Sequence, residues 1–165
     1  MTVTASTPNY RFRRGWEEFT TIPTPASTMI NPGDLIWDNG GVAAVASAFT
    51  WDTNLATTQP EFRVKFLGVA MDQKLASDPY TTAIRVCTRG VFAYPCAALG
   101  AAHHIGECVN ADKDTGNNLL DQQLAIVSGP TLSIGVLAEE AASGATELVV
   151  YLQSFLLYTV NATAS

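Results

Sequence analysis

The most regular pattern of apolar and polar residues in the chain lies over residues 82–95. Small or β-branched residues such as Ile84 and Val86 alternate there with polar side chains, and a period of two over a short run is typical of a β-strand. Gly90 interrupts the run at a point where a bulge or a sharp bend is tolerated. Pro95 has no amide proton to donate, so the pairing of this strand is expected to end there.

Shorter apolar runs bounded by turn residues predict further strands on both sides of this one. Phe62, Val64 and Phe66 alternate with basic residues, which is typical of a half-buried strand. The predicted strands cover residues 35–37, 61–72, 124–127, 132–138 and 147–153, with a strand followed by a turn over 105–116. Several short strands separated by turns predict a mainly β fold, either a small β-barrel or a β-sandwich.

Three segments lack a clear strand pattern. Residues 42–48 are small and apolar and fit either a short helix or a strand. Residues 50–60 are mostly polar and are expected to form a loop. Residues 96–103 are rich in alanine and are compatible with one helical turn.

The chain repeats a similar order of short motifs in its two halves. A glycine, an acid and two apolar residues occur at 33–36 and again at 106–109, and two further pairs of similar segments follow at 67–70 with 134–137 and at 81–86 with 145–150. The offsets between the paired segments are 73, 67 and 64 residues, as loops of different length would give. The repeat predicts two similar β-halves.

Residues 1–30 are rich in Thr, Ser and Pro and are expected to form an extended N-terminal arm, with residues 31–165 as a single β-rich domain. Residues 10–16 interleave aromatic and basic side chains. Such a segment fits an arm that adds a strand to a neighbour or docks on an acidic surface. It equally fits an ordered first strand of the same domain, with its arginines at a solvated edge.

The composition narrows the possible partners. Only 15% of the 165 residues are charged, against roughly 25% in typical soluble domains. This fits an oligomer or a chain that lies against another protein, and it also fits a well-packed β-protein with few surface charges. The net charge of −6 argues against nucleic-acid binding, which needs a basic surface. No segment resembles a signal peptide, and the apolar run 148–160 is shorter than the about 20 residues of a membrane span. We therefore expect neither nucleic acid nor membrane as a partner.

The sequence contains no motif of a catalytic site. Its three cysteines match neither a disulfide framework nor a zinc pattern. The only cluster that raises the question of a metal consists of adjacent His103 and His104 together with Cys96, Cys108, Asp112 and Asp114. Neighbouring residues of a strand point to opposite faces and cannot share one ion, so we expect no metal and no cofactor. Residues 112–116 resemble the opening of a calcium loop but lack its later ligands, and a hairpin turn is expected there.

Several of these stretches resemble small phage capsid decoration proteins, also called cement or head-stabilising proteins. The stretches that carry the resemblance are Gly33-Asp-Leu-Ile36, Phe66-Leu-Gly-Val-Ala70, Ile84-Arg-Val-Cys-Thr-Arg-Gly-Val-Phe92, Ile105-Gly-Glu-Cys-Val109, Asp112-Lys-Asp-Thr-Gly116, Ile134-Gly-Val-Leu-Ala138 and Leu148-Val-Val-Tyr-Leu152. The resemblance implies a barrel-like β fold, commonly a homotrimer, on the outer face of the head shell. There the protein would clamp neighbouring subunits of the major capsid protein.

This resemblance implies a structural virion protein rather than an enzyme, with the major capsid protein and further copies of the chain as partners. A protein of this kind needs contact residues but no active site. We expect Arg11, Arg13, Arg14 and Trp16 to carry part of the contact with the shell, because they combine charge and aromatic surface within a short segment.

Two functions of other classes stay open at this point. A glycan- or receptor-binding module of a virion or cell surface would use exposed aromatic residues, and Trp37 and Trp51 are the candidates. A small metal-dependent enzyme would use His103, His104 and Cys108.

Overall fold

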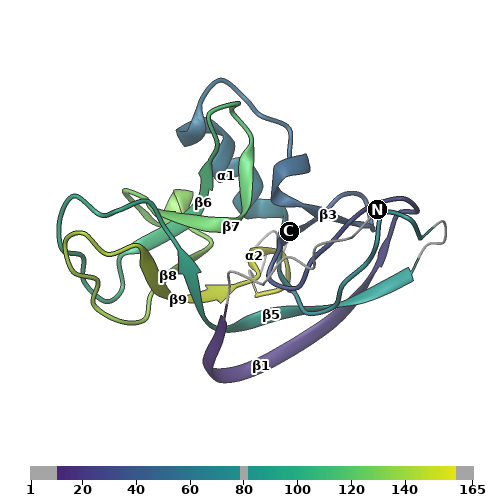
Figure 1. The fold of residues 1–165 in the computed structure, drawn as a ribbon, viewed down its shortest axis with the longest axis horizontal. Helices are drawn as coiled ribbons and strands as arrows, with labels where there is room; N and C mark the ends of the chain where they lie inside the picture. The colour runs from purple at the N-terminus through teal and green to yellow at the C-terminus, as the bar shows by residue number, and fades with distance from the viewer. Residues whose placement is uncertain (1–10, 79–81, 159–165) are drawn as a thin grey trace, which may run out of the picture.

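In the computed structural model, which describes residues 11–78 and 82–158, the chain folds into a nearly closed antiparallel sheet shaped like a barrel (Figure 1). Strand accounts for 45% of the residues and helix for 15%, so the predicted mainly β fold is confirmed. The strands follow the order β3-β2-β4-β5-β9-β8-β6-β7, and β1 pairs with β5 outside this order. The strands are β1 (Arg11–Thr24), β2 (Leu35–Asp38), β3 (Ala43–Val45), β4 (Phe66–Ala70), β5 (Thr82–Pro95), β6 (Cys108–Lys113), β7 (Leu119–Ile126), β8 (Gly135–Leu137) and β9 (Glu147–Gln153). The helices are α1 (Leu55–Lys65) and α2 (Phe155–Tyr158), with single 3₁₀ turns η1 (Ala46–Ala48) and η2 (Pro130–Leu132).

The long strand β5 joins the two halves of the barrel. It has the bounds that its alternating pattern predicts, and it ends at Pro95, which has no amide proton for further pairing. Along its length it pairs with β4, β9 and β1. Phe92 and Tyr94 of this strand are fully buried, and the Tyr94 hydroxyl donates to the Gly33 carbonyl oxygen at 2.7 Å. The strand therefore carries part of the core as well as the central pairing.

The predicted repeat corresponds to a repeat of strand pairing. In the first half β2 pairs with β4 and β4 with β5, and in the second half β6 pairs with β8 and β8 with β9. The partners agree residue by residue. Leu35 faces Val69 as Cys108 faces Val136, and Val69 faces Cys87 as Val136 faces Tyr151, which reproduces the three offsets read from the sequence.

Two glycines show why the repeated motif is kept in both halves. A Cβ added to Gly68 would lie 2.1 Å from the Cys87 carbonyl oxygen, and one added to Gly135 would lie 2.2 Å from the Tyr151 carbonyl oxygen. Both distances are shorter than any Cβ contact found in proteins. Each glycine therefore lets two neighbouring strands approach where a side chain would hold them apart.

The segment 11–24 is a strand of the same sheet. β1 pairs antiparallel with β5 from Arg11 opposite Ala93 to Thr24 opposite Thr82, and Figure 1 shows the two strands side by side. The register shifts three times between Phe12 and Phe19. Of the two interpretations of this segment, an ordered first strand of the domain describes it over the residues that the structure includes. Residues 1–10 of the predicted arm lie outside them.

The predicted loop at 50–60 is correct for residues 50–54 but wrong for residues 55–60, and the first part of the predicted strand at 61–72 is also wrong, because residues 55–65 form α1. Asn54 begins the helix with a capping box, in which its side chain accepts from the Thr57 amide at 3.0 Å. Phe62 and Phe66 are one helical turn apart and both are fully buried, whereas Val64 between them is 44% exposed. Both a period of two and a period of four fit these two phenylalanines, and the helical one is correct.

The remaining predicted segments differ less from the observed elements. The undecided segment 42–48 contains both alternatives, since β3 is followed directly by η1. The alanine-rich segment 96–103 is not helical, and its last residue His103 forms an isolated bridge with Ala141. The predicted strand 132–138 is shorter, because η2 precedes it and β8 covers only Gly135–Leu137. The last predicted strand has the bounds of β9.

The core consists of two apolar clusters. The larger extends through both halves of the barrel and includes Phe62 of α1, and the smaller lies between β1, β2, β4 and β5 and includes Ile22, Ile36 and Ile84. A row of aromatic rings joins β2 to α1, with ring centroids 4.9 Å apart for Trp37 and Phe49 and 5.3 Å apart for Phe49 and Phe62. Edge-to-face arrangements of this kind stabilise beyond the burial of their area. Neither helix of the described part is long and apolar enough to cross a membrane.

Candidate functional site

The four residues predicted to contact a shell all lie on β1. Arg13 is exposed. The side chains of Arg11, Arg14 and Trp16 lie outside the part of the chain that the structure describes. The strand therefore gathers the four positions on one segment at the outside of the sheet, and their joint role stays a prediction.

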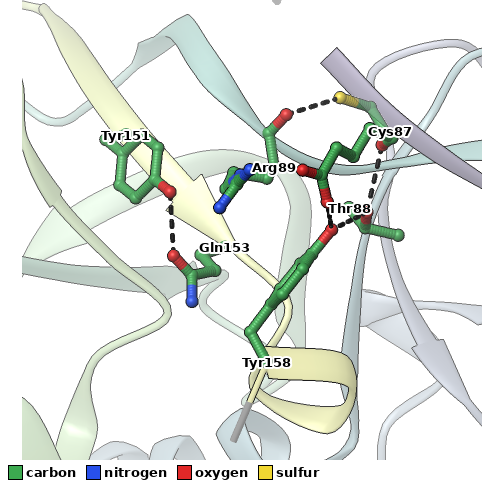
Figure 2. Close-up of polar contacts among 7 residues, drawn as sticks. Cys87, Thr88, Arg89, Tyr151, Gln153 and Tyr158 are labelled. Carbon is green, nitrogen blue, oxygen red and sulfur yellow. Dashed lines mark hydrogen bonds and ion pairs between the residues drawn. The ribbon is translucent and has the colours of Figure 1, made fainter. Parts of the chain in front are cut away.

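A polar cluster around Glu18 ties β1 to β5 and to α2, and Figure 2 shows its members Thr88, Arg89 and Tyr158. The Arg89 guanidinium and the Tyr158 hydroxyl both donate to the Glu18 carboxylate. Thr88 bonds to the Glu18 carbonyl oxygen at 3.0 Å and to the Tyr158 hydroxyl at 2.8 Å. Partial burial and the Glu18 carboxylate raise the pKa of Tyr158, so the phenol stays neutral and keeps its proton for this bond. The cluster fixes the end of α2 against β1.

A shallow cavity of about 290 Å³ lies next to this cluster, where α1 and α2 meet the second half of the barrel. The residues of its lining that carry polar or aromatic groups are Arg63, Cys108, Ser133, Tyr151, Gln153, Ser154 and Phe155. Apolar residues of η2 and β8 complete its wall, and none of the described residues that line it is acidic. The cavity thus combines one cation with a largely apolar surface.

Stacking holds the cation of the cavity in place. The Arg63 guanidinium lies over the Phe155 ring, 4.0 Å from its centroid, and a guanidinium is attracted to the face of an aromatic ring. No carboxylate within the described residues forms an ion pair with Arg63. Its hydrogen-bond donors therefore remain available to a ligand.

A second donor group of the cavity is oriented by its neighbour. The Tyr151 hydroxyl lies 2.8 Å from Gln153 Oε1 and donates to it, and Figure 2 shows the amide nitrogen of Gln153 on the side away from Tyr151. Since the hydroxyl occupies the amide oxygen, the amide presents its two N–H groups to other partners. Ser154, the next residue, begins α2, because its hydroxyl accepts from the Leu157 amide at 3.2 Å.

Apolar side chains are exposed beside the cavity. Val64 on α1 is 44% exposed, and Leu156 and Leu157 on α2 are 43% and 50% exposed. The two helices are in contact with each other, so these exposed side chains are carried by neighbouring elements. We call Val64, Leu156 and Leu157 the apolar rim.

The two histidines of the questioned metal cluster pair with different acids. His103 Nδ1 lies 2.6 Å from Glu107 Oε2, and His104 Nδ1 lies 2.8 Å from Glu140 Oε2. Hydrogen bonding and charge at Glu140 raise the pKa of His104, and the bond from His103 lowers the pKa of Glu107. Within residues 11–78 and 82–158 no group of three or more metal-binding side chains is placed to hold an ion.

The remaining chemical candidates have structural roles. Cys87 and Cys96 are buried, Cys108 is partly exposed at the cavity, and none forms a disulfide. The turn at residues 112–116 belongs to the β6–β7 hairpin, as predicted, with Asp114 Oδ1 accepting from the Gly116 amide at 2.8 Å.

The aromatic residues proposed as glycan anchors are not both available. Trp37 is only 5% exposed, and its indole nitrogen donates to the Val45 carbonyl oxygen at 2.9 Å. The expectation that it is exposed is therefore wrong. Trp51 is partly buried against the core, with the Lys113 ammonium 5.6 Å from its ring centroid.

A buried carboxylate, Asp34, and a half-buried one, Asp121, join the two halves where the barrel nearly closes. Asp34, which precedes β2, is 4% exposed and accepts from Gln122 Nε2 of β7 at 2.8 Å. Asp121 of β7 accepts from the amide of Ser47 in η1 at 2.7 Å. Burial raises the pKa of Asp34 to about 6 and also raises the pKa of Asp121. The contacts hold the seam between β2, η1 and β7.

Comparison with known proteins finds no protein-family model that matches this chain and no curated protein that is similar to it. The function therefore has to be argued from the residues and the geometry above.

Proposed function

We propose that the protein is a structural virion protein that binds the outer surface of a phage capsid and stabilises the shell by clamping neighbouring major capsid subunits. The observation that carries the proposal is the surface of the described part, where few charges accompany exposed apolar side chains. The large apolar side chains that are at least 41% exposed are Phe19, Met29, Val64, Leu75, Ile105, Leu156 and Leu157. Exposed apolar groups on two neighbouring helices, as in the apolar rim, are typical of contact surfaces.

The barrel supports this role mechanically. Pairing of both halves through β5 and the seam at Asp34 give a body in which few loops need to order on contact. Binding then loses little conformational entropy. Many copies of such a body, arranged as homotrimers over a symmetric shell, would add their modest contacts and stabilise the particle by mass action.

The segment with the predicted contact residues needs a test that leaves the sheet intact. Deleting residues 1–30 would remove β1 and its pairing with β5, so loss of binding would have no clear cause. The better experiment replaces Arg13 and Arg14 together with glutamine. The measurement is density-gradient fractionation of particles, with this chain quantified against the major shell protein.

We expect the natural chain to sediment with particles in a fixed, near-stoichiometric ratio, and the Arg13→Gln/Arg14→Gln chain to be depleted from them. The matched control is Lys65→Gln/Lys113→Gln, which removes the same charge at two exposed positions away from β1. Thermal unfolding confirms that each variant is folded. A natural chain that stays in the soluble fraction would refute the proposed function, and equal sedimentation of both variants would refute the role of the two arginines.

A further inference from the structure

The cavity next to the Glu18 cluster has the composition of a site for a small anion with an apolar part. Arg63 supplies a guanidinium that faces no carboxylate among the described residues, and Gln153 supplies an amide whose N–H groups are turned away from Tyr151. A guanidinium binds a carboxylate through two parallel hydrogen bonds, and charge-assisted bonds of this kind are about twice as strong as neutral ones. The two donor groups therefore favour a carboxylate over a neutral group.

The volume and the walls of the cavity limit the rest of the ligand. About 290 Å³ is near the lower end of the roughly 300–1,000 Å³ of ligand sites, so a single side chain or a small organic acid fits. Pro130, Ile134 and Val136 line the wall and offer apolar contact. A short aliphatic stem would cover these surfaces while its carboxylate reaches Arg63.

The donor groups are held before a ligand arrives. Arg63 is stacked on Phe155 at 4.0 Å, Gln153 is bonded to Tyr151, and α2 is held by Ser154 and Tyr158. Groups that are already ordered lose less entropy on binding. Because the protein as a whole carries a net charge of −6, a guanidinium without an acidic partner among the described residues is a feature that sets this cavity apart as a place for an acidic ligand.

We propose that this cavity binds a carboxylate carried on a short apolar stem, as in a glutamate side chain or a small organic acid. The inference does not depend on the proposed function. If the protein binds a shell, however, an acidic side chain of the shell protein is one of the two sources of such a group.

The test is a titration of the full ¹⁵N-labelled chain with N-acetyl-glutamic acid amide, followed by NMR. The matched probe is N-acetyl-glutamine amide, which has the same shape without the charge. We expect saturable shifts of the Gln153 side-chain amide and the Gly135 backbone amide with the acidic probe, with a dissociation constant of about millimolar order. The neutral probe should bind at least about tenfold more weakly.

Variants of the cavity distinguish binding at a specific site from general attraction between the probe and positive charge on the protein. Arg63→Gln should weaken binding of the acidic probe at least about tenfold, whereas Lys65→Gln, which removes the same charge two residues away, should leave it unchanged. Gln153→Glu keeps the size of the side chain, replaces its donors with a carboxylate and should abolish binding. Equal shifts with both probes, or unchanged binding by folded Arg63→Gln and Gln153→Glu chains, would overturn the proposal.

Particle sedimentation then distinguishes the two sources of the carboxylate. An Arg63→Gln chain that leaves the particle fraction, when Lys65→Gln remains, assigns the carboxylate to the shell protein. An Arg63→Gln chain that still sediments with particles but has lost the acidic probe assigns the cavity to a free organic acid. If the natural chain does not sediment at all, the proposed function fails while the titration still decides the cavity.

Discussion

Replacing Asp34 with asparagine should change how the stability of the protein depends on pH. The carboxylate is buried at the seam and accepts hydrogen bonds from the Asn31 amide and from Gln122 Nε2, both at 2.8 Å. Burial outweighs these bonds and, with a smaller contribution from the nearby Asp121 carboxylate, raises the pKa of Asp34 from 3.8 to about 6. At neutral pH Asp34 is ionised in both states, and burial makes its charge less favourable in the folded protein than in the unfolded chain.

The sign and the size follow from proton linkage. Between the two pKa values the folded state binds more protons at Asp34 than the unfolded state, so the free energy of unfolding rises as the pH falls through about 6. The gain continues until the unfolded carboxyl also takes up a proton near pH 3.8. With these two pKa values, lowering the pH from about 7 to about 5 should stabilise the natural protein through Asp34 by about 1.3 kcal/mol.

The assay is urea unfolding of both chains at several pH values between about 7 and 5. Asparagine keeps an acceptor for the Asn31 amide but does not titrate, so Asp34→Asn should lack this gain and differ from the natural chain by a pH-dependent amount. Subtracting the two curves cancels the pH-dependent contributions of the other titratable groups, including His104, whose pKa is raised. The control Asp114→Asn changes an exposed carboxyl whose pKa is lowered, and its difference from the natural chain should stay flat over this range. Parallel curves for the natural chain and Asp34→Asn would refute the reasoning.

Four further substitutions test the construction of the fold. Gly68→Ala and Gly135→Ala should each destabilise the protein by about 2–4 kcal/mol in urea unfolding, because the added Cβ meets a backbone carbonyl oxygen. The control Gly129→Ala has open space around it and should change stability by less than about 0.5 kcal/mol, and equal effects at all three positions would contradict the explanation. Asn54→Ala removes the cap of α1 and should cost about 1 kcal/mol, which an unchanged unfolding midpoint would rule out. Tyr158→Phe removes the hydroxyl that joins α2 to β1 and should speed amide hydrogen exchange in α2, whereas unchanged exchange would show that the apolar contacts of α2 suffice.

The parts of the fold that the sequence predicts well are those in which one local pattern has a single interpretation. β5 and β9 have the bounds that their alternating residues predict. The repeat was visible because each glycine must stay glycine to let strands approach, as Gly68 and Gly135 show. Because only glycine fits at these two positions, the two glycines mark equivalent points of the two halves. The sequence offsets between such equivalent residues match the offsets between the equivalent strand pairs.

The sequence analysis missed α1 because both the period of a strand and the period of a helix fit the same apolar residues. Phe62 and Phe66 satisfy a strand period through Val64 and a helical turn without it. Pro60, inside the helix, also argued against a helix. The signal that favoured the helix was Asn54 followed by Thr57, a capping box in which threonine takes the place usually held by glutamate or glutamine.

The candidate site could not be predicted, because its groups meet only through the tertiary fold. Arg63 stacks on Phe155, which is far from it in the sequence, and neither residue belongs to a motif. The predicted contact residues on β1 came from a local mixture of charge and aromatic groups, which places them on a segment but does not define a partner. Only the β9 pair Tyr151 and Gln153, two residues apart on one strand face, was accessible from the sequence pattern.

The location of the cavity has a reason in the repeat itself. The two halves agree along β2, β4 and β5 against β6, β8 and β9, but they differ in the connection before the fourth and eighth strands. Residues 46–65 contain α1 in the first half, whereas residues 127–134 contain only the single turn η2 in the second. α1 packs against η2, β6 and α2, and its end brings Arg63 to the second half, where the cavity forms. The extra helix, which has no counterpart in the second half, therefore accounts for the position of the cavity in which we propose that a carboxylate binds.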